Sequence, residues 1–326
     1  MLFRSAGSGL VTPGDVITNT ATALWSSLDG DISTPRSTYN PDSVERTGSG
    51  TPSYNDYRAN ASADLRITGV GLDKTVVATS ESATTDPNKV VVGEIVRYRL
   101  VAVIPETTTN SFKLEDQLPA GLKFLNDNTA KIALVSNGGG ITSTTIGAGA
   151  YVTGSAPVTP SFVVPGAAIL GGPTFGNGDD VTFDLGTVVN SDSDADKEYA
   201  VIEFNAIVTN VATNQIGTTL TNVVNFLNNG TKSGTSSTNV RVAEPEIQSF
   251  QKLAVGSDDV TPAAGPFDAG DTVRYRVDVA AKNGGDNAIA YDTRVLDNLP
   301  TTESLVPGSV RVFRNGSQIL SGFSDS

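Results

Sequence analysis

Three polar residues stand at inward-facing positions in stretches typical of β-strands: Lys74, Asp116 and Asn222. Successive side chains of a strand point to opposite faces, so Lys74 shares its face with the apolar Leu72 and Val76. Lysine is among the residues least often fully buried, and a buried charge without a partner is costly. An amine, a carboxyl group and a carboxamide that meet inside one core could supply each other with partners.

The same alternation places Asp116 and Asn222 among apolar neighbours, in the stretches FKLEDQL and LTNVVNF. A slip of one residue in the strand register would turn each of these side chains to the other face. Glu115 is the alternative to Asp116, and Asn225 is the alternative to Asn222. The assignment of the three residues therefore depends on the register.

The composition excludes most familiar catalytic sites. The 326 residues include no cysteine and no histidine, which excludes disulfides, thiol nucleophiles, Ser-His-Asp triads and HExxH zinc sites. A formal net charge of −13 opposes binding to the phosphates of nucleic acids. The sequence contains no apolar run of about 20 residues, so no membrane-spanning segment is expected. The first residues also lack the apolar region of a signal peptide.

The elements that must position the three residues are β-strands. Runs rich in β-branched and aromatic residues alternate with clusters of Gly, Pro, Asn, Asp and Thr, and none keeps a helical period across three turns. Asn315-Gly316 between two apolar runs predicts a hairpin. The predicted fold class is all-β, with tandem Ig-like or Greek-key β-sandwich domains. The predicted strands span 90–104, 111–118, 180–189, 198–211 and 218–226.

An internal repeat groups these strands into domains. The stretch GEIVRYR at 93–99 recurs as GDTVRYR at 270–276, and LEDQLP recurs as VLDNLP. A further motif, TNVVNF in the later part of the chain, resembles TNTATA near its start. The order of the motifs therefore indicates three copies of one domain.

The neighbouring copies contain parts of the same set of polar residues. Lys74 lies 42 positions before Asp116, and Lys252 lies 45 positions before Asp297. Asn19 stands in the earlier TN motif at the place that asparagine occupies in the later one. Lys252, Asp297 and Asn19 are therefore predicted to be members of incomplete sets.

The repeat predicts three domains. Residues 1–66 would be the C-terminal part of one copy, residues 67–243 a complete copy, and residues 244–326 the N-terminal part of the next. Within the complete copy, residues 137–178 are rich in Gly, Thr and Ser, and they predict a long hairpin or an irregular insertion. On this prediction the chain is a fragment of a longer tandem array.

Taken together, the first-strand lysine, GEIVRYRLVAVIP, LEDQLPAGLKF and the late TNVVNF resemble the isopeptide-forming domains of bacterial fimbrial and surface proteins. They are also similar to a related domain that is repeated in tandem on large bacterial adhesins and cell-wall proteins. The resemblance covers nearly the whole chain. It implies a β-sandwich stalk module in which a lysine amine attacks an asparagine carboxamide, helped by a buried acid, to give an intramolecular amide and ammonia.

By motif position, the resemblance assigns Lys74 as the nucleophile, Asp116 as the acid and Asn222 as the electrophile. Burial lowers the pKa of a lysine and raises that of a carboxylic acid. A neutral amine is the nucleophile that the reaction needs, and a neutral acid can donate a hydrogen bond to the developing oxyanion. The alternative is an unreacted set, a buried salt bridge with an amide hydrogen bond.

The resemblance and the composition predict a structural stalk module of a bacterial cell-surface adhesin or fimbria-like protein. Such a module is extracellular, is not an enzyme and needs no cofactor. Its expected partners are neighbouring repeats of the same chain, with a host or cell-surface ligand at a distant tip, and neither nucleic acid nor a membrane. The alternative is a domain that binds a glycan or a protein through residues 137–178, without the crosslink. A glycosidase would need two facing carboxylates, which no motif marks.

An acidic stretch is a weak candidate for calcium. Asp192, Asp194 and Asp196 match positions 1, 3 and 5 of a calcium loop, with Glu203 at position 12. Position 6, however, is Lys197 where such a loop requires glycine, and Glu203 falls within a predicted strand. An acidic hairpin turn is the favoured interpretation, and no metal is expected.

Overall fold

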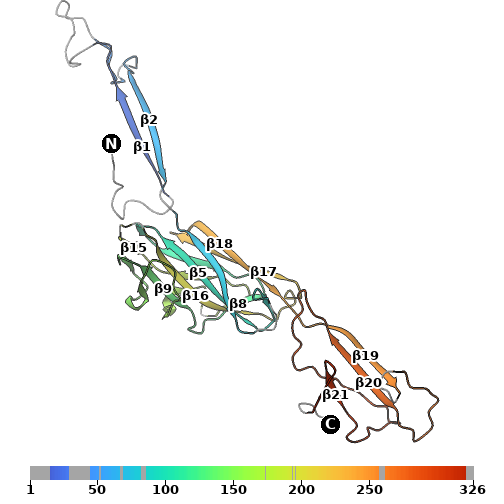
Figure 1. Ribbon diagram of the computed structural model, residues 1–326. Coiled ribbons are helices and arrows are strands. Elements are labelled where there is room, and N and C mark those ends of the chain that lie inside the picture. Colours follow the sequence, from blue (N-terminus) through green and yellow to red (C-terminus); the bar gives the residue numbers. More distant parts are fainter. Residues whose placement is uncertain are drawn as a thin grey trace, which may run out of the picture. The chain divides into compact units, whose positions relative to one another are not determined.

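The regular elements that the structure, a computed structural model, describes are β-strands and two single-turn 3₁₀ helices (Figure 1). It describes residues 15–28, 45–50, 53–66, 69–81, 86–172, 174–192, 194, 196–256 and 261–320. By compactness the chain divides into residues 1–289 and residues 290–326. None of the helices in these described ranges has the length and apolarity that crossing a membrane requires. The all-β class is as predicted, whereas the domain limits at 67 and 243 stay predictions.

A β-sandwich lies between residues 70 and 243, and its first sheet has seven strands. The strand order is β11-β9-β16-β5-β3, with β12 paired to β9 and β8 paired to β16. All these pairings are antiparallel except β11–β9. The strands are β3 (Leu72–Thr79), β5 (Ile95–Ile104), β8 (Leu122–Phe124), β9 (Lys131–Ser136), β11 (Tyr151–Thr153), β12 (Phe162–Val163) and β16 (Glu198–Val208).

The second sheet has six strands in the order β13-β14-β7-β17-β18-β4. Its centre is the β7–β17–β18 group, in which β17 pairs antiparallel with both neighbours. The strands are β4 (Lys89–Val90), β7 (Phe112–Gln117), β13 (Ile169–Leu170), β14 (Val181–Asp184), β17 (Thr219–Asn228) and β18 (Thr231–Val242). The seven-stranded and the six-stranded sheet therefore each contain strands from the early and the late part of the sandwich.

The predicted insertion is a set of short elements, and not a long hairpin. It contains β10 (Ile141–Ser143), two single-turn 3₁₀ helices, η1 (Ala148–Ala150) and η2 (Gly166–Ala168), and the short strands β11, β12 and β13. β10 joins a small third sheet with β15 (Val188–Asn190) and β6 (Thr108–Thr109).

The prediction of one continuous strand at 180–189 is wrong. The segment forms two strands, β14 and β15, which belong to different sheets. Gly186 lies between them at φ +67°, in the left-handed region that residues with a side chain rarely adopt. A Cβ atom at Gly186 would also lie 2.2 Å from Thr144 Oγ1. The glycine therefore redirects the chain from the second sheet to the small one.

The core lies between the two main sheets and is rich in aromatic side chains. Strand β5 alternates along its whole length, with its even-numbered residues buried. Phe204 contacts Tyr98 at 5.7 Å and Phe183 at 5.5 Å between ring centroids, and Phe124 packs on both Phe183 and Phe204. This alternation is the pattern expected of a strand with one face in the core.

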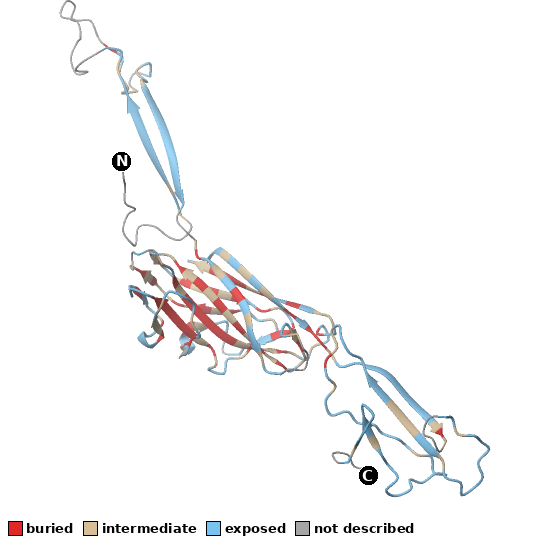
Figure 2. Ribbon diagram, viewed as in Figure 1, coloured by how far each residue is buried: buried red, intermediate tan, exposed pale blue. Residues whose placement is uncertain are grey.

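Other strand pairs are more exposed than the sandwich (Figure 2). β1 (Val16–Leu24) pairs antiparallel with β2 (Arg58–Arg66), and β19 (Ile247–Val255) pairs antiparallel with β20 (Arg274–Ala281). Within residues 290–326, β21 (Val312–Arg314) and β22 (Ser317–Ile319) form the hairpin predicted around Asn315-Gly316.

Candidate functional site

The three predicted residues lie in the sandwich core. Lys74 is on β3 of the seven-stranded sheet, whereas Asp116 on β7 and Asn222 on β17 belong to the six-stranded sheet. They are 3%, 0% and 0% exposed respectively. In the β7–β17 ladder Asp116 lies opposite Val224, so Asn222 is a diagonal neighbour on the same face. The inward orientation predicted from alternation is confirmed, and it brings together groups from both sheets.

Lys74 and Asp116 form a fully buried ion pair between Nζ and Oδ2. Both side chains are 0% exposed. The amine also lies 5.3 Å from the centroid of the Tyr98 ring and 5.7 Å from that of Phe204. The pair is therefore surrounded by aromatic rings, which exclude water from it.

Burial governs the protonation of this pair. Desolvation lowers the pKa of Lys74 to about 8, and the nearby Asp116 carboxylate opposes that change. Burial raises the pKa of Asp116, whereas Lys74 and Asn222 act in the opposite direction. Both directions increase the share of the uncharged amine and of the uncharged carboxylic acid relative to exposed groups. A neutral amine is the form that can attack a carbonyl carbon.

Four buried polar atoms near the pair have no hydrogen-bond partner among the described residues. They are Asp116 Oδ1, both polar atoms of the Asn222 carboxamide and the Tyr98 hydroxyl. The Asn222 carboxamide nevertheless lies near Asp116 and Tyr98, and its hydrogen bonding lowers the pKa of both groups, although no contact among these atoms has the full geometry of a hydrogen bond. A buried polar group without a partner costs about 1–3 kcal/mol. Such a concentration of unsatisfied groups is rare in a native core.

Tyr98 is a member of the site that sequence reasoning missed. It lies on β5 opposite Val76, and its side chain is buried beside Lys74. Burial raises the pKa of the Tyr98 hydroxyl, which therefore keeps its proton and can donate a hydrogen bond. The recurrence of tyrosine in both RYR motifs, as Tyr98 and Tyr275, was the signal that could have found it.

The alternative residues do not reach the lysine side of the sheet. Glu115 lies directly opposite Asn225 in the β7–β17 ladder. Asn225 Nδ2 donates to Glu115 Oε2 at 3.3 Å. Because these two residues occupy the other face of the strands, they form a pair of their own. The register therefore favours Asp116 and Asn222.

The residues predicted for neighbouring copies are exposed. Lys252 lies on β19, with its Nζ 4.4 Å from the centroid of the Tyr275 ring. Asn19 lies on β1 opposite Ala63, and Asp297 lies within residues 290–326. None of these three is in a core like that around Lys74.

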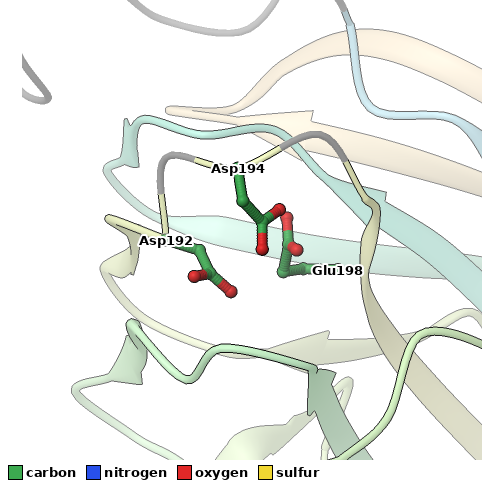
Figure 3. Close-up of side chains that lie close together, drawn as sticks. All are labelled: Asp192, Asp194 and Glu198. Atoms are coloured by element: carbon green, nitrogen blue, oxygen red, sulfur yellow. The ribbon is translucent and has the colours of Figure 1, made fainter.

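A second group of polar residues lies in the loop between β15 and β16 (Figure 3). One oxygen each of Asp192, Asp194 and Glu198 lies within 4.8 Å of the others. Glu198 was missed by the sequence analysis, which named Asp196 instead; Asp196 is outside this trio, although it contacts Asp194.

Glu203, at position 12 of the calcium-loop spacing, lies in a strand, as the sequence predicted, and not in the loop. Glu203 lies within β16, and its side chain is 2% exposed. It accepts hydrogen bonds from Arg97 Nε and Arg99 Nε, each at 2.8 Å. Both arginines come from the neighbouring strand β5, so Glu203 is bound within the sheet and does not serve the loop.

Comparison with known proteins gives no family. No protein-family model matches the chain, and no curated protein matches it. Among solved structures, the C-terminal domain of the AgI/II polypeptide BspA of Streptococcus agalactiae is similar at 15% identity and a TM-score of 0.34, covering 58% of this chain and 55% of that one. The pilus backbone protein RrgB of Streptococcus pneumoniae is similar at 14% identity and a TM-score of 0.30, covering 68% and 48%.

The T6 backbone pilin of serotype M6 Streptococcus pyogenes is similar at 15% identity and a TM-score of 0.29, covering 62% of this chain and 40% of that one. The chain thus spans about half the length of these solved chains. These neighbours are bacterial adhesin and pilus domains. At such TM-scores the likeness carries no inference about function, which must come from the side chains.

Proposed function

We propose that the sandwich is a structural stalk module of a bacterial cell-surface protein, and that Lys74 and Asn222 join in an intramolecular amide. One observation supports this most strongly. An amine, an acid and a carboxamide from opposite sheets share a dry core in which the carboxamide has no hydrogen-bond partner among the described residues. Buried polar groups are normally paired in a native core. Unpaired groups here are therefore what we expect of reactants before the amide forms.

The proposed reaction balances without any external reagent. Lys74, as the neutral amine, attacks Cγ of Asn222, and Asp116 in its acid form donates a hydrogen bond to Oδ1 as negative charge develops there. The proton released by the amine passes through Asp116 to the leaving nitrogen. The C–N bond to the leaving group breaks, ammonia departs, and an Nζ–Cγ amide remains. Asp116 ends in its starting state.

The fold favours this reaction because it holds the reactants together. Fixing reacting groups in place can contribute about 7–11 kcal/mol by removing the cost of a bimolecular encounter. The reaction happens once in each folded domain, so it is maturation and not turnover. In the product, the new N–H and C=O offer Asp116 partners that the separate groups lack.

The position of the crosslink suits a load-bearing module. It would join β3, the first strand of the sandwich, to β17 near its end, and it would tie one sheet to the other. Strands at the two ends of a domain are the first to separate when a chain is pulled from its termini. An amide between them would block that separation and would also protect the domain against proteolysis.

The setting of the module follows from the same proposal. We place it outside a bacterial cell, in a tandem array whose other copies are its neighbours, where stability must come from a crosslink other than a disulfide. The absence of cysteine and the net charge of −13 suit such a setting. A non-enzymatic role without a cofactor follows, and any ligand of the whole protein would bind elsewhere on it.

Intact mass of the full 326-residue chain tests the proposal. Formation of one amide releases one ammonia, so we expect a mass about 17 Da below that of the sequence. The Asn222→Asp variant would lose water instead, about 18 Da below its own calculated mass. Lys74→Ala and Asp116→Ala are expected to show the full calculated mass.

The matched control is Lys123→Ala, which removes an exposed lysine of β8. It is expected to keep the loss of about 17 Da. Fragmentation after proteolysis should yield one peptide pair joined through Lys74 and Asn222. A chain of full calculated mass, after incubation of the folded protein at pH 8 to 9, would show that the three residues form only an ion pair with a neighbouring amide.

A further inference from the structure

Three carboxylates of the acidic segment between β15 and the start of β16 lie close together. Figure 3 shows the side chains of Asp192, Asp194 and Glu198 turned toward one another, and their nearest oxygens lie within 4.8 Å. No ion pair to any of the three is present among the described residues. Three negative charges therefore share a small space without a protein cation.

Glu198 gives a second and independent reason to expect a ligand. It begins β16, is 1% exposed, and its Oε2 accepts a hydrogen bond from Asn190 Nδ2 at 2.7 Å. Its other oxygen, Oε1, is buried and has no partner among the described residues. A buried carboxylate oxygen without a donor is costly unless something positive binds to it.

The surroundings hold the first carboxylate in place. Ser136 Oγ, at the end of β9, donates to Asp192 Oδ2 at 2.7 Å. A Cβ atom at Gly138 would lie 2.3 Å from Asp192 Oδ1, so only glycine leaves room for the carboxylate there. A Cβ atom at Gly140, which has φ +80°, would lie 2.8 Å from the backbone nitrogen of Asp192. Gly138 and Gly140, which follow β9, therefore pack closely against Asp192.

We propose that Asp192, Asp194 and Glu198 bind one calcium ion. Calcium takes oxygen ligands at about 2.3–2.6 Å, so it can bridge oxygens up to roughly 5 Å apart. Magnesium, with ligands at about 2.0–2.1 Å, reaches only roughly 4 Å and keeps its water more firmly. A separation of up to 4.8 Å is within the reach of the larger ion, and water would complete its coordination. This inference does not depend on the proposed crosslink.

Calcium at this point would connect two strands of the seven-stranded sheet with one strand of the small sheet. Asp192 bonds to the end of β9, Glu198 begins β16, and Asn190, the partner of Glu198, ends β15 of the small sheet. The ion would therefore fix the insertion and its small sheet to the main sandwich. Extracellular modules of this kind bind calcium with dissociation constants of about 0.1–1 mM.

Titration of the full chain tests the site. The chain is freed of metal with EDTA, dialysed, and titrated with CaCl₂ by calorimetry, and its melting temperature is recorded with and without 10 mM CaCl₂. We expect one ion bound per chain, a dissociation constant of about 0.1–1 mM, and a rise in melting temperature of a few degrees. MgCl₂ at the same concentration is expected to have a smaller effect.

Two variants and one control separate binding from folding. Asp194→Asn alters an exposed side chain, and Glu198→Gln can still accept the hydrogen bond from Asn190, so both are expected to fold and to lose calcium binding at least tenfold. Asp73→Asn, an exposed change on β3, is expected to bind as the parent does. The proposal fails if calcium gives no heat and no shift, if NaCl of equal ionic strength has the same effect, or if both variants bind normally.

Discussion

Strand pairs β3–β5 and β19–β20 have the same register around their lysines and different burial. Lys74 lies opposite Leu100 in the first pair, and Lys252 lies opposite Val277 in the second. In each pair the strand that follows the lysine carries the same Val-Arg-Tyr-Arg sequence. The pairing therefore follows from the local sequence, which is nearly repeated.

The chemical environment of the two lysines differs. Lys74 is 3% exposed, with its side chain in the core, whereas Lys252 is exposed on β19. The difference comes from the second sheet, because β7 and β17 cover Lys74 and supply Asp116 and Asn222. A strand pair sets the position of a lysine, but only a facing sheet desolvates it and lowers its pKa.

The largest expected effect is the difference in folding stability lost when each of the two lysines is replaced by alanine. A crosslink between Lys74 and Asn222 closes a loop of 148 positions, which by the chain-entropy estimate stabilises the folded state by about 5 kcal/mol. Lys74→Ala is expected to lose at least this much, measured from the urea midpoint of the sandwich transition. Lys252→Ala removes an exposed contact with Tyr275 and is expected to cost about 0.5–1 kcal/mol. Equal losses for the two variants would contradict the comparison.

The next effect is a pH dependence that only the unreacted domain shows. In Asn222→Ala, Lys74 keeps its amine, with a pKa of about 8 in the folded chain against the ordinary lysine pKa of 10.5 in the unfolded chain. Between these values the unfolded state binds more protons, so stability is expected to rise with pH, by about 3 kcal/mol in total. The raised pKa of Asp116 acts in the opposite direction, since the folded state then holds the extra proton.

Urea midpoints at pH 7, 8.5 and 10 measure this rise. The crosslinked parent has no titrating amine at Lys74, so its stability is expected to lack the alkaline increase. Lys252→Ala in the Asn222→Ala background should leave the increase unchanged. A parent chain and a variant with the same alkaline slope would show that the amine titrates in both, and hence that no amide has formed.

The sequence predicted the inward residues well because each lies in a strand with apolar neighbours two positions away. The side chains of Lys74, Asp116 and Asn222 all point into the core. The register places Asp116, and not Glu115, on the core face of its strand. Local alternation carries this information, since a strand has only two faces. The roles assigned to the three residues stay predictions.

The sequence did not reveal which strands belong to the same sheet, because that is decided by pairings between distant residues. The predicted strand at 180–189 divides at Gly186 for this reason. The calcium-loop spacing selected Glu203, whose partners on β5 are about 100 positions earlier in the chain. Glu198 was missed although it opens the predicted strand 198–211 two positions before the buried Ala200, so the alternation that marked Lys74 could have marked it as well.

A smaller effect concerns the tyrosine that follows each glycine motif. The Tyr98 hydroxyl is buried beside the Asn222 carboxamide, where it can donate to the oxygen of the reacting group. Loss of one such donor weakens the interaction by about 1 kcal/mol, so Tyr98→Phe is expected to slow amide formation several-fold. The rate is read from the fraction of chain that has lost about 17 Da after folding. Tyr275→Phe should leave that rate unchanged, and an unchanged rate in Tyr98→Phe would limit Tyr98 to packing.

The last comparison concerns the arginines on the outer face of the two strand pairs. Arg99 shares the 2%-exposed carboxylate of Glu203 with Arg97, whereas Arg276 bonds to Asp278, which is 46% exposed. Arg99→Ala is expected to cost about 1–2 kcal/mol in the urea midpoint, because the charge of Glu203 stays buried with one partner fewer. Arg276→Ala is expected to cost less than about 0.5 kcal/mol, since exposed pairs contribute little. If Arg99→Ala and Arg276→Ala lowered the free energy of unfolding by similar amounts, the burial of Glu203 would not make its ion pair stronger than that of the exposed Asp278.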